Sequence, residues 1–293
     1  METEFAVPEK LDGERLDKVL TELAPGFSRR KIRAAIGKGS VYLNDRRCLK
    51  VSRTVRTGDR IRIAEEADTE RVVQEESVIE GIYDADGLVA VNKPPLCPST
   101  PTRESLRSAQ QFVAGLKKER MADVHPVNRL DLPVSGVLIF ACGRETAAEM
   151  ERLKAGSMIE KTYIAWVKGT PGENSGRIDV PISSERGRAF ADPCGKPSIT
   201  FFKVLRVAGE FSLLEVNPVT GRFHQIRAHL KIAGFPIVGD RKYGEAPYSA
   251  KRPLLHCLRI SFPLPQGSKV LSLEAPPPLD FEEFRRPLAG SRT

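Results

Sequence analysis

Apolar residues recur in two patterns in the larger, C-terminal part of this chain. Short apolar or alternating runs, which are typical of strands, occur at residues 88–92, 137–141, 162–167 and 213–216. Longer stretches with helical spacing occur at residues 109–117 and 145–153. This mixture predicts an α+β enzyme domain, with a mixed, largely antiparallel sheet and flanking helices.

The first sixty residues follow a different pattern, in which two amphipathic stretches precede short strands. The first stretch covers residues 14–23, and a second helix is expected from an N-cap at Ser28 to Ile36. A strand running into a turn is expected at residues 39–45, and an alternating strand follows a glycine turn at residues 60–63. These elements predict a small, separate α/β domain.

An acidic, polar stretch separates the two patterns. Its composition is typical of a linker, which we expect at residues 65–78. The small domain is then expected at residues 1–64 and the enzyme domain at residues 79–285. Residues 286–293 are expected to form a tail.

Length and hydropathy exclude several classes of protein. A chain of 293 residues can bury a sizeable core and a smaller one without disulfides or metals. The mean hydropathy is −0.29, and no apolar run approaches the roughly 20 residues of a membrane helix. Because the first residues also lack the pattern of a secretory signal, we expect a cytoplasmic protein with no membrane partner.

The cysteines and histidines do not predict a metal site. The five cysteines are scattered, and none forms a close pair of the kind that binds zinc. Of the four histidines, His224 and His229 are five residues apart, which does not match the spacing of helical metal ligands. We expect reduced thiols and no metal.

The net charge of +8, with a pI near 9.3, favours an anionic partner, and nucleic acid is the first candidate. Residues 11–64 contain fourteen basic and six acidic residues, and this difference, 14 − 6 = +8, equals the excess of the whole chain. Arg29, Arg30 and Arg33 project away from the apolar side of the predicted second helix. The basic cluster therefore favours contacts with an RNA backbone, with a solvated charged face as the alternative.

Two segments of the larger part offer polar side chains from an apolar frame. In residues 128–136, Arg129 and Asp131 stand on a tight connection before a buried strand. In residues 161–169, Tyr163 belongs to an alternating strand. Taken singly, such an aspartate is typical of a turn or cap, and such a tyrosine is typical of core packing.

Two further segments follow later in the chain. Residues 220–230 join a glycine turn to a predicted helix and contain two arginines, two histidines and a glutamine. Because these groups are costly to bury unpaired, an anionic partner is implied. Residues 234–244 by themselves indicate only turns around a short apolar run.

In this order, the four segments resemble the RluA-type pseudouridine synthases, over residues 82–280. The resemblance is reinforced by Asn92-Lys93-Pro94-Pro95, residues 195–200 and Leu254-Leu255-His256. The basic domain separately resembles the S-four RNA-binding module. The matching residues are Arg15-Leu16-Asp17, Ser28-Arg29-Arg30, Gly39-Ser40-Val41, Asn44 and Gly58-Asp59.

The first resemblance implies an enzyme that isomerises uridine to pseudouridine in RNA without a cofactor. The catalytic aspartate of the family falls on Asp131, with Arg227 as its counter-ion and the ring of Tyr163 against the target base. In the family the aspartate attacks the ribose or removes a proton from ribose carbon 2, and the sequence does not choose between these roles. Arg129 is expected to fill the space left by an extruded base. Substrate contacts are expected from Arg222, His224, Gln225 and Leu255.

Two positions depart from the family pattern. Asn128 stands where a histidine is usual, and Val134 stands where a threonine is usual. Asparagine can still donate and accept hydrogen bonds, whereas valine lacks the hydroxyl of threonine. The departures bear on loop geometry and substrate preference, not on Asp131.

Three hypotheses for the function follow. The first is a monomeric RNA pseudouridine synthase acting on large-subunit ribosomal RNA, by analogy with relatives that carry such a basic module, or on transfer RNA. The second is a non-catalytic RNA-binding or ribosome-assembly factor that retains the fold. The third, a hydrolase that uses Asp131 and His224, lacks an identifiable arrangement of nucleophile and base.

Overall fold

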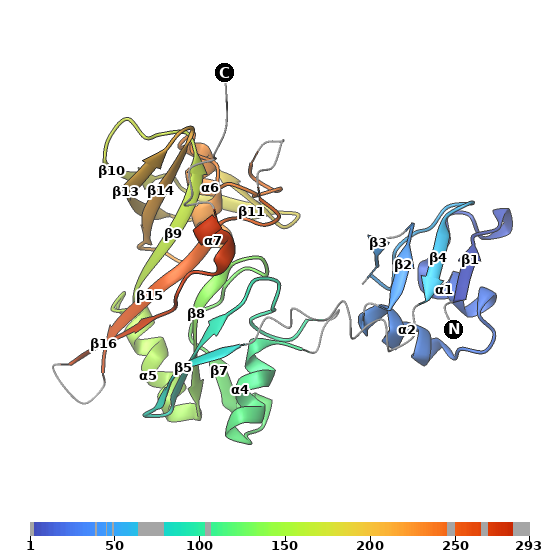
Figure 1. The fold of residues 1–293 in the computed structure, drawn as a ribbon. Helices are drawn as coiled ribbons and strands as arrows, with labels where there is room; N and C mark the ends of the chain where they lie inside the picture. The colour runs from blue at the N-terminus through green and yellow to red at the C-terminus, as the bar shows by residue number, and fades with distance from the viewer. Residues whose placement is uncertain are drawn as a thin grey trace. The chain divides into compact units, whose positions relative to one another are not determined.

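The structure, a computed structural model, describes residues 3–38, 40–44, 46–48, 50–63, 79–102, 107–244, 250–264 and 269–283. These residues form two compact units, one mainly within residues 1–78 and the other mainly from Ile79 onward (Figure 1). The expected linker at residues 65–78 and the expected tail at residues 286–293 lie outside the described residues.

The N-terminal unit combines a four-stranded sheet with two α-helices. Its elements are β1 (Thr3–Ala6), a 3-10 helix (Glu9–Leu11), α1 (Leu16–Leu23), α2 (Arg29–Lys38), β2 (Val41–Leu43), β3 (Arg46–Arg47) and β4 (Arg60–Ile63). The strands lie in the order β1-β4-β2-β3, and every pair is antiparallel. Apolar side chains from the helices and strands form a core that belongs to this unit alone.

The helices of this unit start close to where the sequence predicts them. The first begins at Leu16 instead of residue 14, because the backbone of Arg15 is extended. The second begins after Ser28, whose hydroxyl accepts a hydrogen bond from the Lys31 amide at 3.3 Å. The predicted N-cap is therefore confirmed.

The two sides of α2 differ as the sequence predicts. Ile32 and Ile36 are buried in the core of the unit. Arg29, Arg30 and Arg33 are exposed. One side of the helix therefore packs, and its basic side is open to solvent.

The second unit is built on one mixed sheet. Its strands are β5 (Glu80–Ala85), β6 (Leu88–Lys93), β7 (Val124–Pro126), β8 (Ser135–Cys142), β9 (Glu160–Lys168), β10 (Ser175–Asp179), β13 (Ile199–Ala208), β14 (Phe211–Pro218), β15 (Leu255–Pro263) and β16 (Val270–Glu274). Their order is β10-β13-β14-β9-β15-β8-β6-β5, with β7 beside β8 and β16 beside β15. The pairing is antiparallel except between β15 and β8, which confirms the predicted sheet. A separate hairpin consists of β11 (Ile182–Glu185) and β12 (Arg188–Ala191).

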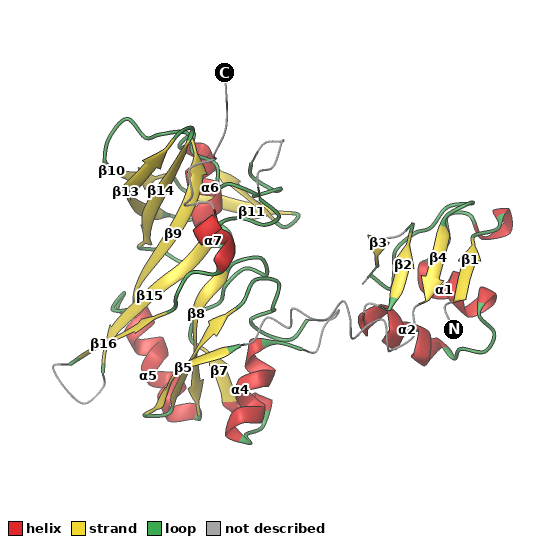
Figure 2. Cartoon of the chain, in the orientation of Figure 1, coloured by secondary structure: helices red, strands yellow, loops and turns green. Residues whose placement is uncertain are grey.

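Helices lie against this sheet at several places (Figure 2). They are α4 (Ala109–Lys117), a 3-10 helix (Met121–Asp123), α5 (Arg144–Ala155), α6 (Gln225–Ile232) and α7 (Leu279–Glu283). The contacts join α4 to β7, α5 to β8, and α6 to β12 and β14. None of the helices in the described ranges is long and apolar enough to span a bilayer.

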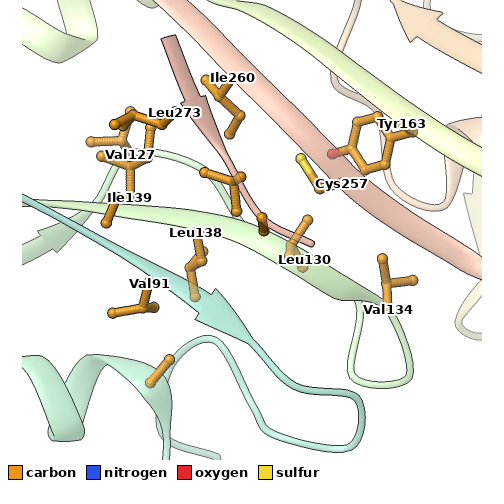
Figure 3. Packing of buried hydrophobic residues seen from close by; sticks show 14 of the residues in the cluster. Val91, Val127, Leu130, Val134, Leu138, Ile139, Tyr163, Cys257, Ile260 and Leu273 are labelled. Carbon is orange, nitrogen blue, oxygen red and sulfur yellow. The ribbon is translucent and has the colours of Figure 1, made fainter. Parts of the chain in front are cut away.

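The core of the second unit follows β8, which lies between β15 and β6. Residues 137–141 are fully buried, as expected of a strand that is covered on both faces. In Figure 3, Leu138 and Ile139 lie among side chains of the neighbouring strands, and Tyr163 and Cys257 lie nearer the other end of the cluster.

The start of β8 comes unusually close to β15. Gly136 lies opposite Cys257 in the parallel pair and has a φ of 118°. A Cβ atom at this position would lie 2.2 Å from the Cys257 carbonyl oxygen. Only glycine therefore allows the chain to enter β8 here, directly after the loop that carries Asp131.

Candidate active site

Hydrogen bonds hold the loop before β8 to its surroundings. The side-chain amide of Asn128 donates to the Val137 carbonyl at 3.1 Å and accepts from the Ile139 amide at 2.9 Å. The Ser99 hydroxyl donates to the Leu130 carbonyl at 2.9 Å and accepts from the Leu130 amide at 3.1 Å. Asn128 thus ties the loop to β8 at the position where the family usually has a histidine.

A buried lysine supports the same loop. Lys93 is fully buried, and its Nζ donates to the carbonyl oxygens of Pro94 and Cys97 at 2.9 and 2.8 Å. The Leu132 carbonyl, next to Asp131 in the chain, lies 3.4 Å from the same nitrogen. Burial lowers the pKa of Lys93 to about 8. The three carbonyls lie at the distances at which a buried ammonium group is stabilised.

An arginine supports the end of the loop. Arg252 binds Asp280 in a bidentate ion pair at 2.6 and 2.7 Å, and its Nη1 donates to the Pro133 carbonyl at 3.3 Å. The Val134 amide donates to the Asp131 carbonyl at 3.0 Å, which closes a turn. The backbone on both sides of Asp131 is therefore braced.

The side chain of Asp131 is held by Arg227, which comes from α6. The Arg227 Nη1 donates to Asp131 Oδ2 at 2.9 Å. The Nε and Nη2 of the same guanidinium donate to both oxygens of Asp240 at 2.7 and 2.8 Å. A bidentate pair of this kind fixes the plane of the guanidinium. Asp240 therefore orients Arg227, and Arg227 orients Asp131.

The three side chains differ in their exposure. Those of Arg227 and Asp240 are 6% and 0% exposed, whereas that of Asp131 is 26% exposed. Among the described residues, nothing donates a hydrogen bond to Oδ1 of Asp131. The carboxylate is therefore held on one side and open to a ligand on the other.

His224 approaches the oxygen of Asp131 that Arg227 binds. Its Nε2 lies 3.4 Å from Asp131 Oδ2, and its Nδ1 lies 2.9 Å from the hydroxyl of Tyr243. Burial lowers the pKa of His224 to about 4. The ring is therefore neutral at neutral pH, so Asp131 has one cationic neighbour and one neutral one.

Tyr163 lies on β9, opposite Val216 of β14 and Cys257 of β15. Its hydroxyl points toward the Cys257 sulfur (Figure 3). Burial above all, together with Cys257 and the charge of Asp131, raises the pKa of Tyr163 well above its usual value. The phenol is therefore protonated and lies within electrostatic range of Asp131.

Three predicted substrate contacts lie at different depths. Arg129 is exposed on the Asp131 loop, and no described residue binds its guanidinium. Arg222 is also exposed, and its Nε donates to the Pro197 carbonyl at 3.3 Å. Leu255 is buried at the start of β15, where its side chain provides an apolar surface.

Gln225 is fully engaged by the protein. Its oxygen accepts from the Thr220 hydroxyl at 2.8 Å and from the Arg222 amide at 3.0 Å. Its nitrogen donates to the Ile199 carbonyl and the Thr200 hydroxyl, both at 3.0 Å. The substrate contact predicted for Gln225 would break bonds that use its whole hydrogen-bonding capacity. We assign it to holding the glycine turn before α6.

Two other histidines are likewise engaged by protein groups. His229 lies 2.9 Å from both the Thr200 hydroxyl and the Val180 carbonyl. His256 lies 2.9 Å from both the Ser135 hydroxyl and the Ala275 carbonyl. Across the described ranges, no three His, Cys, Asp or Glu side chains gather as a metal site.

Asp240 is a site residue that the sequence pattern did not reveal. Its segment indicated only turns, yet Gly239 has a φ of 75°, and a Cβ there would lie 2.1 Å from the Arg252 carbonyl oxygen. The glycine directly before this carboxylate was the feature of the sequence that could have pointed to Asp240. The sequence of residues 220–230 implied an anionic partner, and the carboxylates of Asp131 and Asp240 in the chain itself supply part of it.

Comparison with known proteins bears on this site. Residues 87–231 match the family model of RNA pseudouridylate synthases, and residues 14–61 match the S4 domain. The ribosomal large subunit pseudouridine synthase C of Rickettsia bellii is 30% identical over 290 residues, which cover 91% of this chain and 95% of that protein. An uncharacterized RNA pseudouridine synthase of Aquifex aeolicus is 34% identical over 265 residues, covering 84% and 82%.

A solved structure has the same fold. The human RNA pseudouridylate synthase domain containing 1 matches with a TM-score of 0.58 at 23% identity, covering 68% of this chain and 83% of that one. The relatives in sequence match over nearly their whole length, and the matched region contains the Asp131 loop, β9 and most of α6. The chain therefore belongs to the RNA pseudouridine synthases, isomerases that convert uridine to pseudouridine, and it carries an S4 domain before the catalytic domain.

Proposed function

We propose that this enzyme modifies uridines of large-subunit ribosomal RNA, with Asp131 as its catalytic carboxylate. The observation that carries the proposal is the half-held carboxylate, in which Arg227 binds Oδ2 and leaves Oδ1 open. Relatives that match nearly the whole chain are named as large-subunit synthases, which supports this substrate class. The exposed arginines of α2 add a surface for RNA phosphates.

The reaction breaks the bond from ribose carbon 1 to base N1 and forms one to base carbon 5. The net change moves a proton from carbon 5 to N1, so no oxidant or reductant is consumed. Oδ1 of Asp131 faces the ribose, either attacking carbon 1 or removing a proton from carbon 2. In both routes, the fixed Oδ2 keeps the reactive oxygen in position before the substrate arrives.

Tyr163 supplies a ring beside this carboxylate. Because its pKa is raised well above the usual value, it acts as a neutral phenol, stacking on the base and donating a hydrogen bond. The target base must leave its stack in the RNA to reach the site, and this unstacking costs a few kcal/mol. The exposed side chain of Arg129, two residues before Asp131, is suited to fill the vacated space.

The substitution Asp131→Asn tests the proposal, because it keeps the size of the side chain and removes the charge. We expect the loss of pseudouridine at the sites in large-subunit RNA that cells lacking the gene also fail to modify. The matched control is Asp84→Asn, a surface carboxylate paired with Lys117 at 2.7 Å, which should modify these sites fully.

Each alternative function predicts a different result when the pseudouridine sites in cellular RNA are mapped. If cells lacking the gene lose pseudouridine only in transfer RNA, this would contradict the proposed substrate class and support a transfer RNA synthase. Full modification by Asp131→Asn would contradict the proposed catalytic role. A non-catalytic assembly factor predicts that Asp131→Asn rescues a deletion strain as well as wild type does, whereas removal of residues 1–64 does not.

A further inference from the structure

A tyrosine that the sequence pattern left without a role lies beneath the catalytic pair. Tyr243 is 5% exposed and follows Asp240 by three residues. Its ring centre lies 5.1 Å from the Arg227 guanidinium carbon, and its edge meets the ring of His224 at a centroid distance of 5.6 Å. Tyr243 therefore touches both side chains that approach Asp131.

The hydrogen bonds of Tyr243 have a defined direction. The Ala189 amide of β12 donates to the tyrosine oxygen at 2.7 Å. Because a backbone N–H can only donate, the single proton of the hydroxyl is available to His224 Nδ1 at 2.9 Å. In a neutral imidazole, a nitrogen that accepts carries no proton, so the ring proton lies on Nε2. The Ala189 amide and the Tyr243 hydroxyl, donating in turn, thus select the tautomer of His224 whose N–H faces Asp131.

The ring of His224 is also fixed in place. Its backbone has a φ of 51°, in the left-handed region that residues other than glycine rarely adopt. The ring stacks on Phe223 at a centroid distance of 3.8 Å and an interplanar angle of 21°. Rotation of the ring would break this stack and the bond to Tyr243.

The neutral form of His224 suits its surroundings. The charged groups that act on it are Asp131, Asp240, Arg227 and Lys242. A protonated ring would place a third cation among them, beside the guanidinium that already pairs with Asp131. A neutral N–H adds a donor to Asp131 without adding charge.

We propose that Tyr243 and His224 are positioning residues for the reaction: Tyr243 selects the Nε2–H tautomer of His224, which holds Asp131 Oδ2 together with Arg227. This inference rests on the proposed catalytic role of Asp131. The 3.4 Å from Nε2 to Oδ2 is long for a hydrogen bond, as is common in enzymes without substrate. The two donors on Oδ2 leave Oδ1 for the ribose.

The substitution Tyr243→Phe tests the proposal, because it removes the hydroxyl and keeps the ring. At saturating ribosomal RNA, we expect the single-turnover rate to fall about tenfold, the effect of losing one well-placed hydrogen bond in the transition state. The RNA dissociation constant should stay unchanged, since the hydroxyl is buried. The matched control is Tyr83→Phe, whose exposed hydroxyl lies 2.9 Å from Asp86 and should give the wild-type rate.

A second measurement separates positioning from loss of structure. Nitrogen NMR of the whole protein distinguishes protonated from unprotonated imidazole nitrogens, and comparison with His224→Gln assigns His224 among the four histidines. We expect a protonated Nε2 and an unprotonated Nδ1 in the wild type, and a mixture of tautomers in Tyr243→Phe. A purely structural role would leave the tautomer unchanged.

An unchanged tautomer of His224 in Tyr243→Phe would overturn the inference, and so would either of two other outcomes. One is a proton on Nδ1 of His224 in the wild-type enzyme. The other is a wild-type turnover rate in Tyr243→Phe, whether or not the tautomer changes. Failure of the proposed function has a different signature, which is a wild-type enzyme no more active on ribosomal RNA than Asp131→Asn.

Discussion

Each unit of this enzyme contains a cluster of aspartate and arginine side chains, and the two clusters differ mainly in the exposure of their arginines. In the N-terminal unit, Asp17 pairs with Arg15 and Arg33, whose side chains are 54% and 61% exposed. In the catalytic unit, Arg227 is 6% exposed and is shared between Asp131 and Asp240. The arginines are thus open to solvent in one unit and enclosed in the other.

Exposure decides what each cluster can do. An ion pair whose arginine is exposed is screened by water and contributes up to about 1 kcal/mol, and two such arginines share Asp17, so one of them can turn to an RNA phosphate while the other stays paired. A buried ion pair cannot exchange its partner for water, because each charge left alone would cost several kcal/mol. The first arrangement suits binding to a flexible, charged RNA backbone, and the second suits holding the Asp131 carboxylate in a fixed position.

The largest effect is expected from breaking the buried cluster. Arg227→Met leaves Asp240 buried without its counter-ion, which should lower the free energy of unfolding by about 3–5 kcal/mol and abolish pseudouridylation. Trp166, the only tryptophan, is fully buried in β9, so its fluorescence during urea unfolding reports on this unit.

The control for this experiment is an exposed pair of the same kind. Arg177→Met removes the partner of Asp179, where the arginine is 53% exposed, and should change stability by less than about 1 kcal/mol. Equal losses in Arg227→Met and Arg177→Met would contradict the distinction between enclosed and exposed ion pairs.

Mild acid should affect the two units differently, because all four histidines lie in the catalytic unit. Burial lowers the pKa of both His224 and His256 to about 4, below the usual 6.5. Unfolded chains therefore bind more protons between pH 6.5 and 4, so the stabilisation is complete above pH 6.5 and is lost toward pH 4. For His256 alone the loss is on the order of 3 kcal/mol.

The N-terminal unit should respond only at lower pH. Burial raises the pKa of Asp17, but the hydrogen bonds and charges of Arg15 and Arg33 outweigh it, so that the net pKa lies below 3.8. Its contribution is present above pH 3.8 and is lost below it. Urea titrations at pH 7 and pH 5 should move the Trp166 transition and leave hydrogen exchange in α1, corrected for intrinsic rates, unchanged. A shift of equal size in both units would contradict this expectation.

The smallest effect on turnover is expected from the exposed arginines. Replacing both Arg29 and Arg30 with alanine should weaken RNA binding and lower the slope of log affinity against log salt by about 1.5, if each meets one phosphate. Turnover at saturating RNA should not change. Replacing both Arg152 and Lys154 on α5 with alanine removes the same charge and serves as the control. A slope equal to that of wild type would rule out phosphate contacts by Arg29 and Arg30.

Local patterns in the sequence predicted the elements well. The strands around residues 88–92, 137–141, 162–167 and 213–216 all exist and extend by at most two residues at either end. This success has a physical basis. Alternation of apolar and polar residues, and short apolar runs, arise because residues close in the sequence lie on the same buried element. The resemblance to the family then brought Asp131, Tyr163 and Arg227 together, and the structure places Arg227 at 2.9 Å from Asp131.

Residues whose role depends on distant partners could not be predicted in this way. Gln225 was expected to contact substrate, but from the start of α6 it binds Ile199 and Thr200 of β13. Asp240 was interpreted as part of a turn, because nothing in its own segment reveals that Arg227 lies beside it in the fold. Tyr243 had no assigned role for the same reason.

The sequence by itself determined the two-part organisation, the helices and strands, and the basic side of α2. These features follow from the periodicity of apolar residues, from composition and from short motifs, all of which are local. Only the tertiary structure decided which oxygen of Asp131 is held, what orients Arg227 and which nitrogen of His224 faces the carboxylate. Hydrogen bonds have direction and limited reach, so these details exist only once α6, the Asp240 turn and the β11–β12 hairpin have packed together.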